Sequence, residues 1–212
     1  LRTFYLLNTA ENYADYVHAL EYFNCPGQNF VYADVEGNIA LWHAGNTPAK
    51  WAKQGMFISD GTDPRYDWQA TVPHHQKPHV KNPRRGYVGS ANQHPTTTDY
   101  PYFLSEFYWA SFRWNQIHKR LDTLQSATLN DMLEIQLDNR SVFAEKTMPI
   151  ILRTWKGHLK NDLEKQTFTI LSNWNYEMDG HSPAPTLYRY WYRILEELTW
   201  KDDLGIDNER FI

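Results

Sequence analysis

Cysteine is almost missing from this 212-residue sequence, which contains only Cys25. A single cysteine cannot form an internal disulfide bond, so the chain is not a disulfide scaffold. A lone cysteine can still act as a nucleophile if a base activates it. Cys25 lies in a turn-like stretch, residues 24–27, with no base nearby in the sequence. A structural role is therefore the simpler interpretation of this residue.

Long apolar runs and an excess of basic residues are lacking as well. No stretch approaches the roughly 18 apolar residues of a membrane-spanning helix. The formal net charge is −4, whereas a nucleic-acid partner favours a basic surface. The sequence therefore predicts neither a membrane span nor a nucleic-acid partner.

Several motifs that identify enzyme sites are absent. The chain has no HExxH zinc motif, no pair of cysteines, no glycine-rich phosphate loop and no Gly-x-Ser-x-Gly elbow. The densest histidine cluster is His74, His75 and His79, in a proline-rich segment. Adjacent histidine side chains in such a segment need not converge, so we expect no transition-metal site there.

Aromatic residues, in contrast, are abundant and make up 16% of the chain, while hydrophobic residues make up 42%. This content is typical of proteins that bind sugars or flat organic groups, and also of proteins with a large aromatic core. Core packing is the simpler interpretation, and composition alone leaves both open. The length suits one large domain or part of a bigger protein.

The first part of the chain is predicted to contain a helix and a β-hairpin. Apolar residues at helical spacing indicate a helix over residues 9–23, with Thr9 as its cap. Residues 30–34 and 39–44 are β-rich runs on either side of a Gly-Asn turn, which is typical of a hairpin.

A long segment rich in glycine and proline follows, over residues 45–85. It shows no lasting periodicity, which predicts an ordered loop, and long loops inside compact domains are often functional. Residues 86–92 then suggest a short strand whose small residues permit close backbone approach.

From about residue 105 the pattern becomes helical. One helix is indicated around residues 112–124, and Thr128 with Asp131 resembles a capping box that starts another. Ser141 is expected to cap a third helix that reaches Trp155. Two more helices are predicted over residues 162–172 and 185–199.

Strands therefore precede helices, which is typical of the α+β class. We expect a strand-and-loop part over residues 1–104 and a mainly helical part over residues 105–212.

Six stretches, in order along nearly the whole chain, resemble motifs of the penicillin acylase family. They are residues 28–39, 63–68 with 72–73, 82–93, 99–101 with 110–113, 131–138 with 140–141, and 171–175 with 182–188. Each stretch is weakly specific alone, whereas six in the correct order are strong evidence. Two departures are Ala40, where the family usually has glycine, and Gln93, where it has a second asparagine.

The resemblance implies part of an N-terminal-nucleophile hydrolase with an αββα fold. In that family a precursor cleaves itself and exposes a serine, which attacks an amide with its own α-amino group as base. The resemblance aligns this chain downstream of that serine. Leu1 has no hydroxyl or thiol to replace it. We therefore expect an internal segment of the large (β) chain, whose partners are the small chain and the rest of the same precursor, in the periplasm.

The resemblance also implies catalytic roles for Asn92 and Arg113. The family's matching asparagine donates hydrogen bonds to the oxyanion that forms during amide hydrolysis. Its matching arginine orients that asparagine, because a guanidinium can hold the amide oxygen and turn the NH₂ group toward substrate. Without the resemblance, Asn92 would be a turn residue and Arg113 a solvated helix residue. Gln93 keeps the amide group of the family's second asparagine, but on a side chain that is longer by one methylene.

Two further residues match positions of the family's acyl pocket, Phe4 and Gln28. Phe4 aligns with an aromatic lining residue, and Gln28 with an aliphatic one in some relatives. If both line the pocket, it is more polar than one built for phenylacetyl groups. Both positions equally suit ordinary packing.

No cofactor is expected for catalysis, but the family carries a structural calcium ion. Pro64 matches one of its backbone-carbonyl ligands. Calcium takes six to eight oxygen ligands, and most of the acidic ones would lie upstream of this chain. The family's later aspartate falls near Leu104, which cannot bind calcium, and Glu106 is shifted from that position. We therefore expect calcium, if present, only in the complete enzyme.

Two functions from different classes follow. The first is a fragment of an amidohydrolase that cleaves linear amides, such as β-lactam acyl amides or acyl-homoserine lactones. The second is an aromatic-rich module that binds a small molecule or carbohydrate without catalysis. The sequence upstream in the complete gene discriminates between them, since the first function requires a cleavage junction before the nucleophile.

Overall fold

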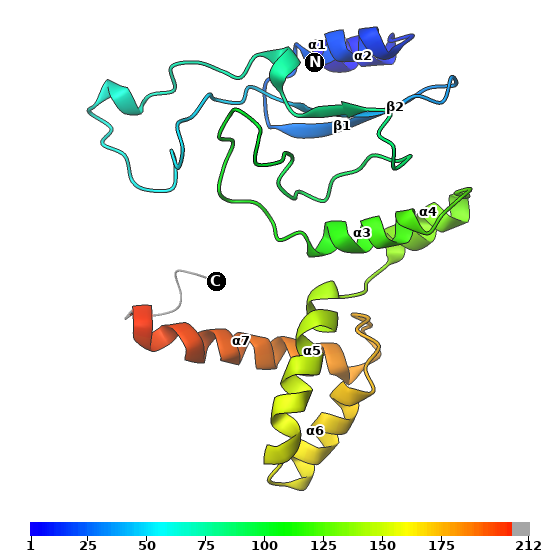
Figure 1. Ribbon diagram of the computed structural model, residues 1–212, viewed down its shortest axis with the longest axis vertical. Helices are drawn as coiled ribbons and strands as arrows, with labels where there is room; N and C mark the ends of the chain where they lie inside the picture. The colour runs from blue at the N-terminus through cyan, green and yellow to red at the C-terminus, as the bar shows by residue number, and fades with distance from the viewer. Residues whose placement is uncertain (205–212) are drawn as a thin grey trace. The chain divides into compact units, whose positions relative to one another are not determined.

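A computed structural model of the chain describes residues 1–204 (Figure 1). The predicted helical part therefore ends, at residues 205–212, outside the described residues. Contacts divide the chain into two compact units, Leu1–Trp114 and Asn115–Ile212. Each unit has its own hydrophobic core, so the two are described separately.

The first unit begins with two helices, α1 (Arg2–Asn8) and α2 (Tyr13–Leu20). The helix predicted over residues 9–23 is confirmed as α2, but it is shorter, and the predicted start at Thr9 was wrong. Thr9 ends α1, where its hydroxyl donates to the carbonyl of Leu6, and Asn12 caps α2 by accepting the N–H of Asp15. Asn12 has an extended backbone, with φ −156° and ψ 176°, so a continuous helix cannot pass through it.

A three-stranded antiparallel sheet follows, with the order β1-β2-β3. The predicted hairpin is confirmed as β1 (Gln28–Ala33) and β2 (Ile39–Ala44). Its turn contains Gly37 at φ +85°, a conformation that glycine adopts without a steric penalty. β3 (His79–Lys81) pairs with β2. The sequence did not predict this strand, because three residues are too few to show an alternation of apolar and polar side chains.

The loop between β2 and β3 contains two short 3₁₀ helices, η1 (Pro64–Tyr66) and η2 (His74–Gln76). The predicted strand over residues 86–92 was wrong, because these residues have no strand neighbour. Gly86 and Asn92 have φ angles of +75° and +65°, which are incompatible with an extended strand.

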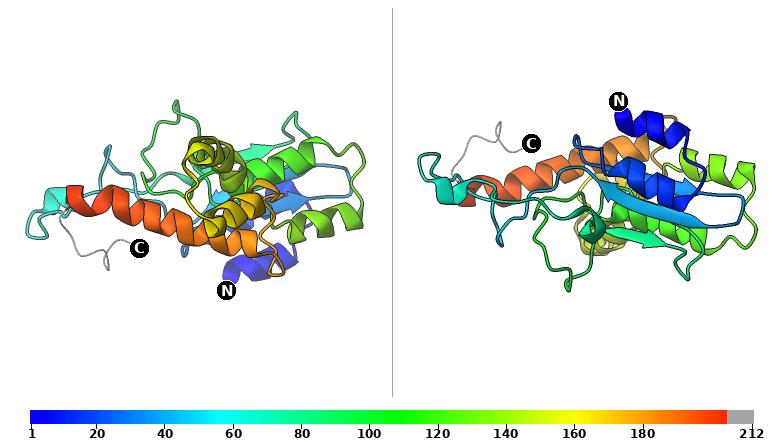
Figure 2. Two further views of the ribbon diagram at one scale, coloured as in Figure 1. Left: turned by 90° about the horizontal axis from the view of Figure 1, so that it is seen from below. Right: turned by 90° about the horizontal axis from the view of Figure 1, so that it is seen from above.

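The two faces of the sheet differ. α1 and α2 lie over one face, as Figures 1 and 2 show. The core on this side consists of the buried residues Tyr16, Leu20, Phe23, Trp42 and Ala44. Side chains alternate along a strand, so Asn29 and His43, which are partners in the β1-β2 register, point to the opposite face.

The second unit is helical. Its elements are α4 (Leu129–Leu137), α5 (Val142–Trp155), η3 (Lys156–His158), α6 (Asp162–Ser172) and α7 (Pro183–Leu204). α3 (Phe112–Asp122) begins at the end of the first unit and continues into the second. The predicted capping box at Thr128 and the cap at Ser141 are confirmed, whereas α7 begins earlier and extends further than the predicted helix over residues 185–199.

A core between α5, α6 and α7 holds the second unit together. Its buried members are Ala144, Met148, Leu171, Trp174, Ala184 and Tyr188. Thr147 and Tyr188 join α5 to α7 through a hydroxyl pair at 2.9 Å. The helices therefore pack on a mixture of aliphatic and aromatic side chains, as the composition suggested.

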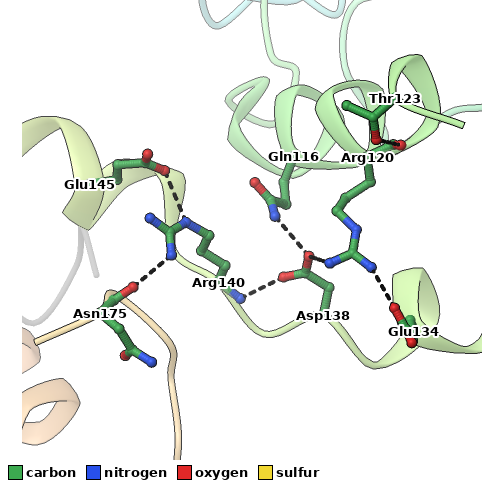
Figure 3. Close-up of polar contacts among 8 residues, drawn as sticks. All are labelled: Gln116, Arg120, Thr123, Glu134, Asp138, Arg140, Glu145 and Asn175. Carbon is green, nitrogen blue, oxygen red and sulfur yellow. Dashed lines mark hydrogen bonds and ion pairs between the residues drawn. The ribbon is translucent and has the colours of Figure 1, made fainter. Parts of the chain in front are cut away.

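A polar network fixes the connections before α5 (Figure 3). The carboxylate of Asp138 accepts from Gln116 Nε2 at 2.7 Å and from the backbone N–H of Arg140 at 2.9 Å. Arg140 in turn donates to Glu145 at 3.2 Å and to the carbonyl of Asn175 at 2.7 Å. Asp138 and Arg140 belong to a stretch that matches the resembled family, and here they bind protein groups.

Candidate active site

The candidate site is the turn of residues 90–93, which follows the glycine-rich segment of the first unit. The backbone N–H of Ala91 donates to Gln93 Oε1 at 2.7 Å, and that of Asn92 donates to Ser90 Oγ at 3.3 Å. These side-chain acceptors replace a strand partner, which explains why the segment is not a β-strand. Asn92 has φ +65°, a left-handed conformation that asparagine tolerates better than most residues.

Arg113 holds this turn from the first turn of α3. Its Nη2 donates to the carbonyl oxygen of Ala91 at 2.8 Å and to Asn92 Oδ1 at 2.9 Å. A guanidinium can only donate, so the Asn92 atom that it contacts must be the amide oxygen. The NH₂ group of Asn92 therefore points away from Arg113. The structure brings together the two residues for which the sequence predicted catalytic roles, and Asn92 is exposed.

A pocket of about 660 Å³ lies beside the turn in the first unit. Ser90 and Gln93 contribute to its wall, together with Asn29 of β1 and the cations Lys77 and Arg85. Lys77 is 5% exposed, and burial lowers the pKa of its ammonium group. The pocket therefore combines amide, hydroxyl and basic groups with the carboxylate of Asp99 and with apolar residues.

Comparison with known proteins decides the family. The family model for penicillin amidase matches residues 1–212. The chain belongs to the penicillin amidase family. This match confirms the resemblance to penicillin acylases that was predicted from the sequence.

Individual relatives are distant and longer. The chain is 27% identical to penicillin G acylase from Escherichia coli over 151 residues, which cover 69% of this chain and 18% of the relative. It is 25% identical to the acyl-homoserine lactone acylase QuiP from Pseudomonas syringae pv. tomato over 191 residues, which cover 84% of this chain and 23% of that protein. The aligned residues thus span about a fifth of either relative.

The fold agrees with this assignment. A thermostable penicillin G acylase from Alcaligenes faecalis matches with a TM-score of 0.73 at 19% identity, over 98% of this chain and 38% of that one. The α+β class predicted from sequence is confirmed, and the chain shares the fold of the matching part of that penicillin G acylase. Within residues 1–204, no helix is both long enough and apolar enough to cross a membrane.

Phe4 and Gln28, the predicted acyl-pocket residues, lie on α1 and at the start of β1. Phe4 is on α1, with its ring 6.2 Å from Phe23 and 6.5 Å from Phe30. Gln28 begins β1, and by strand alternation it faces the same side as Phe30. No contact among the described residues ties either one to Asn92, so their substrate roles stay predictions.

The calcium role of Pro64 stays a prediction, and the structure shows how its carbonyl is bound within the protein. Its carbonyl oxygen already accepts two hydrogen bonds, from Gln69 Nε2 at 3.0 Å and from the N–H of Asp67 at 3.2 Å. Leu104, which aligns with the family's later aspartate, has no carboxylate, and its carbonyl accepts from the Lys50 ammonium at 3.3 Å. Both oxygens therefore serve protein donors. Within residues 1–204, no group of three or more His, Cys, Asp or Glu side chains is arranged to hold a metal.

The histidine cluster has a packing arrangement instead. The rings of His74 and His79 stack on Trp42, with centroids 4.9 and 4.1 Å from the indole. Burial, followed by the charge of Lys77, lowers the pKa of His74. His74 and His79 thus both pack on the Trp42 indole, an arrangement that the sequence did not reveal.

Sequence reasoning also missed three polar residues around the turn, Asn29, Ser90 and His43. The signal was present in part, because hairpin register places Asn29 and His43 opposite each other on one face. The register does not show which other segment of the chain packs against this face of the sheet. Only the fold brings Ser90 there.

Proposed function

We propose that this chain is a segment of an amidohydrolase that cleaves linear amides of acylated small molecules. Suitable substrates are β-lactam acyl amides and acyl-homoserine lactones, in line with the names of the relatives. In this proposal the nucleophile is an N-terminal serine that lies outside this chain, and the precursor exposes it by cleaving itself. The observation that carries the proposal is the contact between Arg113 and Asn92.

The chemical argument starts from the charge that develops during amide hydrolysis. Attack on the carbonyl carbon moves negative charge onto its oxygen, which neutral fixed donors stabilise best in a dry site. Arg113 occupies the oxygen of the Asn92 amide, so the two N–H donors of that amide remain for the substrate. Because Arg113 also holds the Ala91 carbonyl, the donor is fixed before substrate arrives.

The remaining parts of the proposal concern the complete protein. The partners are the other segments of the precursor, the small chain and the rest of the large chain, and the location is extracytoplasmic. Catalysis by a serine and its own amino group needs no cofactor. Calcium, if the complete enzyme binds it, would take its ligands mainly from other segments, since the Pro64 and Leu104 carbonyls are engaged here.

The test is replacement of Asn92 in the complete, self-processed enzyme. Asn92→Ala should lower kcat by about 10²–10³ with a small change in KM, because an oxyanion donor acts mainly in the transition state. Alanine is strained at φ +65°, so Asn92→Gly is measured beside it, since glycine removes the amide without this strain.

Two controls make the result decisive. Mass spectrometry of the chains shows whether each variant has matured, since a failure of self-cleavage imitates lost catalysis. Asn82→Gly removes a different asparagine with a positive φ, +48°, on the hairpin side of the fold. If processed Asn92→Gly enzyme keeps near-normal kcat on an amide, the oxyanion assignment is wrong and Asn92 is a turn residue. Substrate binding without any hydrolysis by the wild-type enzyme would instead favour the binding module.

A further inference from the structure

Asn29 connects the sheet to the Asn92 turn. It is the second residue of β1 and points to the face opposite α1 and α2. Its Nδ2 donates to Ser90 Oγ at 2.9 Å, across 61 positions of sequence. The same Ser90 oxygen accepts the backbone N–H of Asn92 at 3.3 Å. A single hydroxyl thus joins a strand side chain to the backbone of the proposed oxyanion residue.

His43 fixes the direction in which the Asn29 amide points. Its Nδ1 lies 3.2 Å from Asn29 Oδ1, an oxygen that can only accept, so Nδ1 must carry a proton. Burial, followed by the charge of Lys77, lowers the pKa of His43 and favours the neutral ring. The Nδ1–H is present in the neutral and the protonated ring alike. With Oδ1 engaged by His43, the NH₂ group of Asn29 is left to face Ser90.

The Asn92 turn is therefore held from two directions. Arg113 binds the side-chain oxygen of Asn92 and the carbonyl of Ala91, while the link through Ser90 holds the Asn92 N–H. We propose that Asn29 and Ser90 are a positioning pair that sets the backbone of the Asn92 turn, so that the amide held by Arg113 points toward the substrate oxyanion. This inference rests on the proposed function of Asn92.

The pair is tested with small substitutions in the complete, processed enzyme. Asn29→Asp keeps the size of the side chain but replaces the NH₂ donor with oxygen, and Ser90→Ala removes the shared acceptor. Each variant should lower kcat about tenfold, which is the effect of losing one hydrogen bond that acts in the transition state. The KM should change by less than about twofold. Ser90→Thr keeps the hydroxyl and should recover most of the loss.

A double-variant cycle tests the connection between the two residues. Asn29 acts through Ser90, so the Asn29→Asp/Ser90→Ala double variant should be little worse than either single variant. Asn46→Asp is the matched control, since it makes the same substitution at an exposed asparagine of the same unit. Multiplicative losses in the double variant would overturn the link. The link would also be overturned if the loss of kcat paralleled a fall in the thermal unfolding midpoint and Ser90→Thr did not restore kcat.

Measurement of Asn92→Gly in the same series separates this inference from the proposed function. If Asn92→Gly loses kcat while Asn29→Asp and Ser90→Ala keep it, the positioning pair is overturned and the proposed function stands. If Asn92→Gly keeps kcat, the proposed function falls and this inference falls with it. Parallel losses of kcat, with maturation intact and strong coupling, support both.

Discussion

One nitrogen of Arg113 serves two acceptors that belong to neighbouring residues, the Ala91 carbonyl and the Asn92 amide oxygen. The planar guanidinium gives its N–H donors fixed directions, so both acceptors are held in one geometry. A lysine ammonium has a shorter reach and no fixed fork. The identity of the cation at residue 113 is therefore a geometric requirement as well as a matter of charge.

Arg113→Lys in the complete enzyme should lower kcat by about tenfold or more, because the Asn92 amide loses its orientation while positive charge is kept. Arg113→Ala should lower it further. The measurement is kcat and KM for an amide substrate with processed enzyme. Equal activity of the Lys variant and the wild type would show that only the charge at residue 113 matters.

The stack of His74 on Trp42 predicts a pH dependence of stability. Burial lowers the pKa of His74 in the folded chain below its ordinary value of 6.5, so the unfolded chain binds more protons at mildly acidic pH. Its contribution to stability is therefore present above about pH 6.5 and is lost as pH falls below that value.

Chemical unfolding of the chain at pH 7.5 and pH 5.5 measures this effect, with NMR titration of the histidine rings as a direct readout of pKa. His74→Phe keeps a ring against Trp42 and should lose less stability on acidification than the wild type. His75→Phe, at the exposed neighbouring position, is the control. An identical pH dependence in the His74 variant and the wild type would contradict the prediction.

Among the elements, α4 depends most on its own sequence. It contains no buried residue, and three leucines on one side of it, Leu129, Leu133 and Leu137, are 53–89% exposed. The capping box is its clearest local support: the Thr128 hydroxyl accepts from Asp131 N–H, and the Asp131 carboxylate accepts from Thr128 N–H at 2.7 Å. These bonds from Thr128 also lower the pKa of the Asp131 carboxyl.

Thr128→Ala should lower the free energy of opening of the first turn of α4 by about 0.5–2 kcal/mol, the usual contribution of such a cap. Amide hydrogen exchange in α4 measures this change. Thr128→Ser keeps the hydroxyl and serves as the control. Unchanged exchange in the Ala variant would mean that packing, and not the cap, determines where α4 begins.

The sequence predicted an element correctly where contacts between neighbouring residues are enough to determine it. The Gly37 turn, the Thr128 capping box and the Ser141 cap depend on neighbouring residues, and each was located correctly. The predicted start of the helix over residues 9–23 was wrong, because Thr9 and Asn12 both have cap chemistry and helical spacing does not choose between them. The prediction failed over residues 86–92, because the groups that satisfy that backbone are side chains.

The candidate site shows the same division. Spacing alone gives no reason to place Arg113 beside Asn92, since the two residues are 21 positions apart, across irregular chain and the start of a helix. The resemblance supplied that pair, and the structure supplied the contact. Asn29 and Ser90 were found only after folding, because their contact depends on where the loop meets the sheet.

At the scale of the whole molecule, the chain covers about a fifth of its curated relatives, and the nucleophile of the proposed reaction is outside it. The 212-residue chain by itself should therefore show no turnover of amides. The assay uses a panel of acyl amides and acyl-homoserine lactones, with complete processed enzyme as the positive control. Turnover that copurifies with this chain, and that disappears in its Asn92→Gly variant, would contradict the proposal that the nucleophile lies elsewhere.

The sheet of the first unit also has an open side. β1 is paired only with β2 among the described strands, and Val31 on β1 is 65% exposed. An unpaired strand edge presents free N–H and C=O groups, which attract another strand. In the proposed enzyme, another segment would pair with this edge.

The core of the second unit is made from residues close together in sequence, between Ala144 and Tyr188. Contacts over such short separations require little loop closure, and chains rich in them fold in microseconds to milliseconds. The β1 edge of the sheet, by contrast, can pair only after the proposed partner strand from another segment of the enzyme is present. During synthesis we therefore expect the α5–α7 core to form without waiting for distant segments, which makes assembly of the sheet the slow step of maturation.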